Sequence, residues 1–143
     1  MFVDTHTHLY VPEFDADVAQ VIERGLAAGV QRFILPAIDS TYTQRMRQLE
    51  KAYPFCVSVM AGLHPTHVGP GFEQELTHVH HQLSTEKCIA VGEIGIDLYW
   101  DKTYLREQKE AFARQIQWAR DFNLPFAIHC RQAFDEVLER FGF

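Results

Sequence analysis

The sequence predicts an α/β fold with a parallel sheet, arranged as part of a TIM-type (β/α)8 barrel. Short apolar runs alternate with longer amphipathic runs along all 143 residues, which is the pattern of repeated strand–helix units. Successive predicted strands begin roughly 30 residues apart, the size of one βα unit. Polar residues able to carry chemistry fall at the ends of these strands, where barrel enzymes place their sites.

Periodicity and punctuation define the individual elements. The predicted strands comprise residues 2–5, 32–37, 55–62, 89–95 and 126–130. Their nearly continuous apolar residues are typical of strands covered on both faces. Apolar residues at helical spacing predict helices at residues 15–28, 41–52, 73–84, 104–122 and 133–141. Gly29 after the first helix, and Pro54 and Pro125 before two strands, are suitable boundary residues.

An open doubly wound sheet is the competing architecture. No GxGxxG or GxxxxGK[ST] segment follows a predicted strand, so the nucleotide-binding forms of that sheet lack their motif. The barrel is favoured because candidate functional residues end or follow four different predicted strands: His6, His8, His64, Glu93 and His129.

The length of the chain limits how much of a barrel it can form. A complete (β/α)8 barrel takes about 250 residues, and five βα units account for the whole sequence. We therefore expect residues 1–143 to form a single incomplete barrel domain, truncated before its C-terminal units.

Composition narrows the classes of partner. The formal net charge of −6 argues against broad electrostatic capture of nucleic acid, although bound cations can supply positive charge locally. The three cysteines, Cys56, Cys88 and Cys130, form no CxxC pair and predict neither a zinc ribbon nor a disulfide framework. Reduced thiols, and the absence of a signal peptide or a long apolar run, favour a cytoplasmic protein without membrane contact. No protein partner is indicated.

Four residues predict a metal centre. His6 and His8 are two residues apart at the end of a predicted strand, so both imidazoles face the same side. Glu93 places a carboxylate in an otherwise apolar run with no basic residue adjoining it, which is costly unless a cation pairs with it. His129 ends the fifth predicted strand in the same way.

This mixture of imidazoles and a carboxylate suits a divalent ion such as zinc, manganese or magnesium. Such ions lower the pKa of a bound water and polarise a phosphoryl or carbonyl oxygen, so the indicated reaction is hydrolysis. If two ions are bound about 3.5–4 Å apart, Glu93 is the carboxylate placed to bridge them.

Four segments resemble the successive signatures of one family. They are Phe-Val-Asp-Thr-His-Thr-His-Leu at 2–9, Gly-Leu-His-Pro at 62–65, Gly-Glu-Ile-Gly-Ile-Asp at 92–97, and Pro-Phe-Ala-Ile-His-Cys-Arg-Gln-Ala-Phe-Asp at 125–135. In this order they resemble the TatD family of metal-dependent deoxyribonucleases, which are amidohydrolase-like TIM barrels. The resemblance extends from residue 2 to the end of the chain.

The resemblance implies roles for individual residues. His6 and His8 would bind one metal, Glu93 would bridge two and serve catalysis, and His129 would bind the second. His64 would lie near the substrate, and Arg131 would contact a phosphate oxygen. Members of the family cleave phosphodiester bonds of DNA as 3′-to-5′ exonucleases or related enzymes, usually with magnesium or a similar ion.

Two departures from the family pattern qualify this expectation. Tyr10 stands where the family usually has Asp or Asn. The family also has a later histidine and a later aspartate, the latter a metal ligand and expected general base, and neither is present here. We therefore expect the isolated chain to bind metal weakly and to show little nuclease activity. A PHP-type or other amidohydrolase-type phosphoesterase and a non-catalytic half-barrel fragment are the alternative hypotheses.

Further polar residues leave two interpretations open. Asp97, followed by Tyr99 and Trp100, is either a substrate contact or a loop-stabilising residue. Asp4 either orients a ligand histidine or belongs to ordinary backbone pairing. The histidines at 78, 80 and 81 are interpreted as a solvated helical face, and helix 104–122 as a packing element only.

Overall fold

The computed structural model describes residues 1–142. Its strands are β1 (Phe2–Asp4), β2 (Val30–Leu35), β3 (Val57–Val59), β4 (Val91–Asp97) and β5 (Phe126–Arg131). Its α-helices are α1 (Val18–Ala27), α2 (Thr43–Ala52), α3 (Phe72–Thr85), α4 (Leu105–Asp121) and α5 (Phe134–Glu139). Three short 3-10 helices, η1 (Pro12–Phe14), η2 (Ser40–Tyr42) and η3 (Pro65–His67), follow β1, β2 and β3. The predicted order of strands and helices is confirmed.

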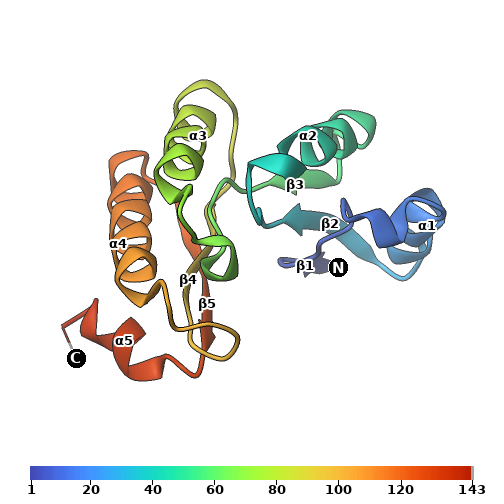
Figure 1. The fold of residues 1–143 in the computed structure, drawn as a ribbon. Coiled ribbons are helices and arrows are strands. Elements are labelled where there is room, and N and C mark those ends of the chain that lie inside the picture. Colours follow the sequence, from blue (N-terminus) through green and yellow to red (C-terminus); the bar gives the residue numbers. More distant parts are fainter. Residues whose placement is uncertain (143) are drawn as a thin grey trace.

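All strands of residues 1–142 run parallel. β1, β2 and β3 form one sheet in that order, and β4 pairs with β5 in a second. The two sheets are joined by the bridge between Ala61 and Val91 and by the bond from Gly92 N to Ala61 O at 2.9 Å. The strands thus form one arc, with α1 and α2 flanking β1–β3, and α3 and α4 flanking β4 and β5 (Figure 1). This is the partial TIM-type barrel that the sequence predicts.

Two apolar cores lie between the arc and its helices. Ile22 of α1 and Leu35 of β2 are fully buried in the first, and Leu76 of α3, Ile94 of β4 and Phe112 of α4 are almost completely buried in the second. Burial of such large apolar side chains is the main force holding each helix against its strand.

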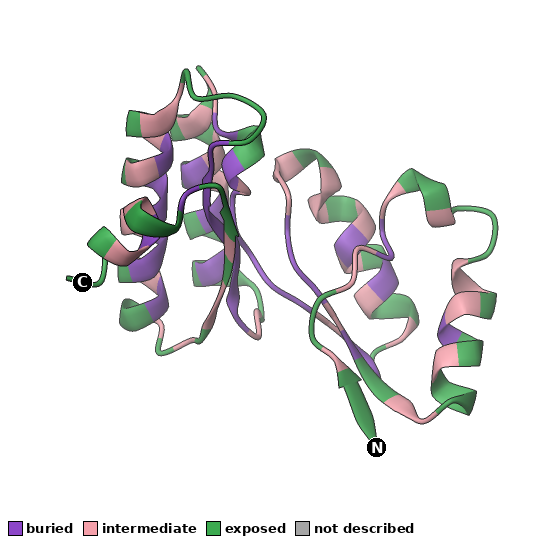
Figure 2. Cartoon of the chain, turned by 90° about the horizontal axis from the view of Figure 1, so that it is seen from below, coloured by how far each residue is buried: buried purple, intermediate pink, exposed green. Residues whose placement is uncertain are grey.

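The expectation that every strand is covered on both faces is wrong for the two outermost strands. β4 is buried along its whole length, whereas Phe2 and Val3 of β1 are 66% and 46% exposed and Ile128 of β5 is 42% exposed. Figure 2 shows β1 as an exposed strand at the N-terminal edge. The reason is geometric, because within residues 1–142 β1 and β5 are the two edges of the arc and have no strand beyond them.

A search of residues 1–142 finds no helix with the length and apolar character needed to cross a membrane.

Candidate metal centre

The structure brings the predicted histidines and Glu93 together, but not at the strand ends. β1 ends at Asp4, so His6 and His8 follow the strand, while Thr7 N still bonds to Ile34 O of β2 at 3.1 Å. Glu93 lies within β4 and His129 within β5 rather than at their ends. Pairing of Asp97 with Arg131 extends both strands past the predicted limits.

The Glu93 carboxylate lies at the centre of the cluster and is surrounded by imidazoles. Its Oε2 atom is 3.0 Å from His6 Nε2 and 3.6 Å from His8 Nε2. Its Oε1 atom is 3.1 Å from His129 Nδ1 and 3.8 Å from His64 Nε2. The two carboxylate oxygens of one buried side chain therefore face two different pairs of histidines.

Tyr10 fixes the orientation of His8. The Tyr10 hydroxyl donates a hydrogen bond to the Pro36 carbonyl, and it lies 2.8 Å from His8 Nδ1. Since its one proton goes to Pro36, the hydroxyl accepts from His8 Nδ1–H. The lone pair of His8 is then on Nε2, the atom that faces Glu93. Burial and the negative charge of Glu93 raise the pKa of Tyr10, so this hydroxyl stays protonated.

Asp97 fixes the orientation of His129 in the same way. His129 Nε2 lies 2.7 Å from Asp97 Oδ2 and donates to it, which leaves Nδ1 facing Glu93. The hydrogen bonds to Glu93 and then to Asp97 raise the pKa of His129, although burial opposes them. With Nε2–H donating to Asp97, the lone pair of the neutral ring is on Nδ1, which lies 3.1 Å from Glu93 Oε1 and 3.2 Å from His64 Nε2. A cation bound between these groups can use this lone pair.

His64 differs from the other histidines because it presents an N–H group to the cluster. Its Nδ1 accepts from Thr66 N at 3.2 Å, so the proton is on Nε2, which lies 3.2 Å from His129 Nδ1. Burial lowers the pKa of His64 to about 4, and His64 is therefore neutral at pH 7. A neutral imidazole here is a hydrogen-bond donor that carries no charge.

The Glu93 carboxylate stays ionised although the side chain is buried. Burial alone raises its pKa, but the interactions with His129 and His8, and the nearby His64 and His6, outweigh burial and keep the pKa well below its usual range. Within residues 1–142 the basic side chains that lie against the Glu93 carboxylate, at 3.0–3.8 Å, are all histidines, with neither lysine nor arginine among them. The carboxylate is thus an ionised group available to a cation.

The donor set fits a divalent metal. His6, His8 and Glu93 form one triad and His64, Glu93 and His129 another, and in each the candidate ligand atoms lie within 4.8 Å of one another. Because His64 Nε2 carries a proton, the metal ligands of the second triad are Glu93 and His129. Imidazole nitrogen and carboxylate oxygen are ligands suited to zinc, manganese or magnesium. Because Glu93 belongs to both triads, the geometry can accommodate one ion on each side of this carboxylate.

Two glutamines of α4 hold the backbone around the cluster. Leu63 N donates to Gln115 Oε1 at 2.7 Å, and Asp97 N donates to Gln108 Oε1 at 2.8 Å. Gln108 Nε2 also returns a bond to Asp97 O at 3.1 Å. Both glutamines are almost fully buried, and each takes the place of a neighbouring strand for one backbone segment. The interpretation of helix 104–122 as packing alone missed this function.

Close packing of β4 on its neighbours needs glycine. Gly95 has φ +147°, and a Cβ there would lie 1.9 Å from the His129 carbonyl oxygen. A Cβ on Gly62 would lie 2.6 Å from the carbonyl carbon of Gly92. Both contacts lie next to residues of the metal cluster, so these glycines set the separation between its histidines and Glu93.

The remaining predicted residues lie around this cluster. Asp4 Oδ1 accepts from His6 N at 3.1 Å, so it holds the backbone of a cluster histidine rather than its ring. Arg131 ends β5, with its guanidinium over the ring of Tyr99. His78 lies apart, bonded to Thr43. From the sequence, Tyr10 stands out only as a departure from the family pattern, although its two-residue spacing from His8 is the available signal for their contact.

The chain is similar in sequence to known proteins of one family. A family model described as TatD related DNase matches residues 3–141. The chain belongs to the TatD family. Among its TatD relatives, the metal-dependent hydrolase YabD of Bacillus subtilis, described as uncharacterized, is 36% identical over 138 residues, covering 96% of this chain and 54% of YabD. A Pectobacterium carotovorum protein named 3′-5′ ssDNA/RNA exonuclease TatD is 30% identical over 136 residues, covering 94% of this chain and 52% of its own length.

Solved structures of TatD proteins share the fold. The crystal structure of YjjV, a TatD homologue from Escherichia coli K12, superposes with a TM-score of 0.89 at 29% identity, covering 99% of this chain and 55% of YjjV. A TatD-family hydrolase from Entamoeba histolytica, at 20% identity and a TM-score of 0.77, matches in fold. The chain thus spans about half the length of the TatD proteins it matches. It is a member of a metal-dependent hydrolase family with clustered candidate ligands.

Proposed function

We propose that this chain carries the metal-binding part of a TatD-type nuclease that hydrolyses phosphodiester bonds of DNA. The observation that supports this most directly is the single buried carboxylate of Glu93 shared by two groups of imidazoles. A family relative named as an ssDNA/RNA exonuclease supports a nucleic-acid substrate, and we favour single-stranded DNA.

The residues divide into two proposed metal positions within a single domain, residues 1–143. His6 and His8, which lie against Glu93 Oε2, would hold the first ion together with Glu93, and His129, which lies against Oε1, would hold the second. Such ions polarise a phosphoryl oxygen and make a bound water more acidic. Glu93 stays ionised between them, because its pKa is held far below neutral pH, and Tyr10 and Asp97 keep the ligand rings oriented.

The substrate phosphate is proposed to lie against His64 and Arg131. His64 offers an uncharged Nε2–H group that donates to a phosphate oxygen without competing for a metal. Arg131 ends the neighbouring strand with an exposed guanidinium, whose N–H groups match phosphate geometry.

Cleavage of a labelled oligonucleotide tests this function. The purified chain is incubated with 5′-fluorescein single-stranded DNA and Mn²⁺ or Mg²⁺, and products are resolved on a denaturing gel. We expect slow cleavage that requires the metal, stops with EDTA and is lost in Glu93→Gln. Substitution of Glu73, an exposed glutamate on the outer helices, provides the control: Glu73→Gln should cleave like the wild type.

Hydrolysis of small phosphomonoesters distinguishes the nuclease from the alternative function, a PHP-type or other amidohydrolase-type phosphoesterase. Hydrolysis of p-nitrophenyl phosphate without cleavage of DNA would contradict the nuclease function, as would DNA cleavage that persists unchanged in Glu93→Gln.

A further inference from the structure

An exposed aromatic pair borders the metal cluster and has no role in the function proposed above. Tyr99 and Trp100 follow β4 directly and are 47% and 70% exposed. Their rings meet edge to face, with centroids 4.7 Å apart and planes at 89°. Large contiguous apolar surfaces on loops at the carboxyl ends of barrel strands are commonly binding surfaces.

The pair is fixed in position and linked to the cluster. Asp97 Oδ1 accepts from Tyr99 N at 2.9 Å and from Trp100 N at 3.4 Å. The other oxygen of the same carboxylate accepts from His129 Nε2. One buried side chain therefore orients a candidate metal ligand and also holds the backbone of the aromatic loop.

Arg131 adds positive charge beside the rings. The carbon of its guanidinium lies 3.7 Å from the centroid of Tyr99 and 5.4 Å from that of Trp100. Within residues 1–142, the ion pairs between carboxylates and arginine or lysine side chains lie elsewhere, and none of them includes Arg131. Figure 1 shows the loop between β4 and α4 beside the end of β5, where Arg131 lies. A stacked guanidinium keeps its N–H edge available to an anion.

The surface next to Trp100 is hollowed on the side of η3. Pro65 and Thr66 line this hollow together with Trp100. Thr66 is also the residue that orients His64. A flat group lying on the indole would therefore sit between the aromatic loop and the turn that carries His64.

We propose that the indole of Trp100 forms a stacking platform for a base of single-stranded nucleic acid, with Tyr99 meeting the indole edge to face and Arg131 contacting the adjoining phosphate. This assignment rests on the proposed nuclease function, and it identifies the part of the substrate held outside the metal cluster. A base has the flat π-face that exposed aromatic rings accept regardless of sequence, and the nearby cation matches its phosphate. The platform thus favours an unpaired strand over a duplex, whose bases are already stacked.

Fluorescence of a single tryptophan tests the platform. The chain has two tryptophans, and Trp118 packs against His80 and Arg114 on the outer helices. In the Trp118→Phe background Trp100 is the sole emitter. Titration with a thymidine hexamer in EDTA, where hydrolysis is prevented, should quench its emission. A hexamer of abasic deoxyribose phosphate, of equal charge, should bind at least about 5-fold more weakly.

Substitutions assign the effect to the ring. Trp100→Ala should bind the thymidine hexamer about 5- to 150-fold more weakly, measured by anisotropy of a labelled strand, and should bind the abasic hexamer as before. Trp100→Phe keeps an aromatic face and should recover most of the affinity. Phe55 is 93% exposed and lies before β3, at the other end of the strands, so Phe55→Ala should leave binding unchanged.

Equal affinity for the two hexamers, or unchanged binding in Trp100→Ala, would overturn the platform. Either result leaves the Glu93-dependent cleavage assay unaffected. Conversely, loss of the nuclease function in that assay, with base-dependent quenching of Trp100 retained, would refute the nuclease while supporting base binding.

Discussion

Glu93 and its histidines show how single residues create a site that a cation completes. The carboxylate is buried and ionised, and the basic side chains that lie against it within residues 1–142 are imidazoles. In two of these imidazoles the second ring nitrogen makes a hydrogen bond to another residue: His8 bonds to Tyr10, and His129 bonds to Asp97. Such outer contacts set ring orientation and basicity, and they therefore control metal affinity.

Removal of the Tyr10 hydroxyl tests whether this residue influences metal affinity through His8. We expect Tyr10→Phe to bind Mn²⁺ or Zn²⁺ about 10- to 100-fold more weakly, measured by isothermal titration calorimetry, because His8 loses the partner that fixes its tautomer. Tyr42 packs against Tyr10 with ring centroids 5.5 Å apart, and Tyr42→Phe is the matched control. If both variants bind metal like the wild type, Tyr10 does not orient the ligand.

The low pKa of His64 makes the metal-free chain sensitive to pH. The folded value is about 4, below the 6.5 of an unperturbed histidine, so the unfolded chain takes up a proton first as the pH falls. The stability contributed by the neutral imidazole is complete above about pH 6.5 and is lost between pH 6.5 and pH 4. From pH 7 to pH 5 the wild type should lose about 2 kcal/mol more unfolding free energy than His64→Gln.

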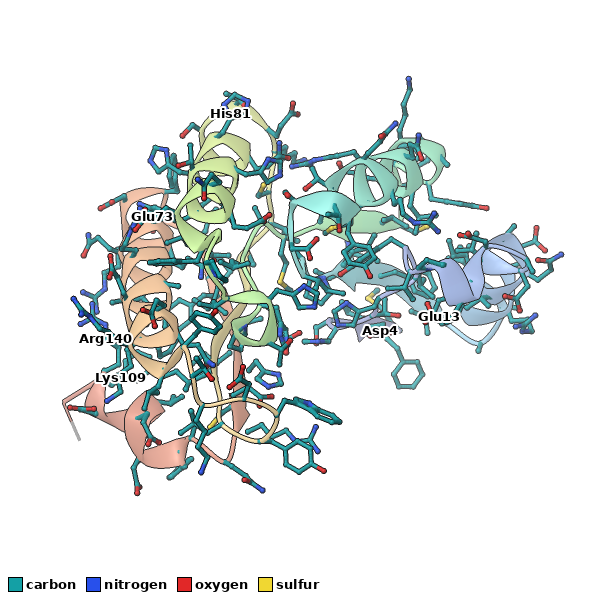
Figure 3. The ribbon with its side chains drawn as sticks, in the orientation of Figure 1. Asp4, Glu13, Glu73, His81, Lys109 and Arg140 are labelled. Atoms are coloured by element: carbon teal, nitrogen blue, oxygen red, sulfur yellow. The ribbon has the colours of Figure 1, made fainter. Side chains whose placement is uncertain are left out.

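Urea unfolding in EDTA at the two pH values measures this difference. His81 is exposed on α3, and Figure 3 shows it on the outer side of that helix. His81→Gln should therefore follow the wild type at both pH values. Parallel losses in the wild type and His64→Gln would mean that His64 is protonated normally in the folded chain.

At the scale of elements, the separation of β4 and β5 depends on a glycine. Gly95 is paired with His129 and has a positive φ of +147°. Since a Cβ would lie 1.9 Å from the His129 carbonyl oxygen, Gly95→Ala cannot keep this pairing. We expect a loss of at least about 3 kcal/mol of unfolding free energy, together with loss of metal binding.

Gly69 provides the comparison, because no heavy atom lies within 4 Å of the Cβ position there. Gly69→Ala should change stability little, as followed by circular dichroism during urea unfolding. A Gly95→Ala chain as stable as Gly69→Ala would show that β4 and β5 can separate without cost.

The elements also show what could be predicted from sequence. Local apolar periodicity suffices for the strands and helices, and the carboxyl ends of parallel strands lie together, so clustering of His6, His8, Glu93 and His129 was predictable. The extension of β4 to Asp97 was not, because it depends on pairing with Arg131, far along the chain. The hydrogen bonds of Gln108 and Gln115 were not predictable either, because helical periodicity does not identify which backbone groups a buried amide will contact.

For the whole molecule, the open arc is the feature with physical consequences. Within residues 1–142 its edge strands β1 and β5 each pair with a strand on one side alone, and they expose apolar side chains, notably Phe2, Val3 and Ile128. Unprotected parallel edges of this kind pair with other strands. The half-barrel hypothesis therefore makes a prediction about association that is separate from catalysis.

We expect the chain to self-associate in a concentration-dependent way through these edges. A lysine on an edge strand opposes pairing by charge repulsion and desolvation, so Val3→Lys and Ile128→Lys should shift the chain toward monomer in sedimentation velocity experiments. Leu26 has a similar exposure, 44%, but belongs to helix α1 and not to an edge strand. Leu26→Lys should therefore leave the association unchanged. If all three variants reduce association equally, general surface hydrophobicity rather than edge pairing drives the association. If the wild type is monomeric at high concentration, the edge strands do not pair and the prediction is wrong.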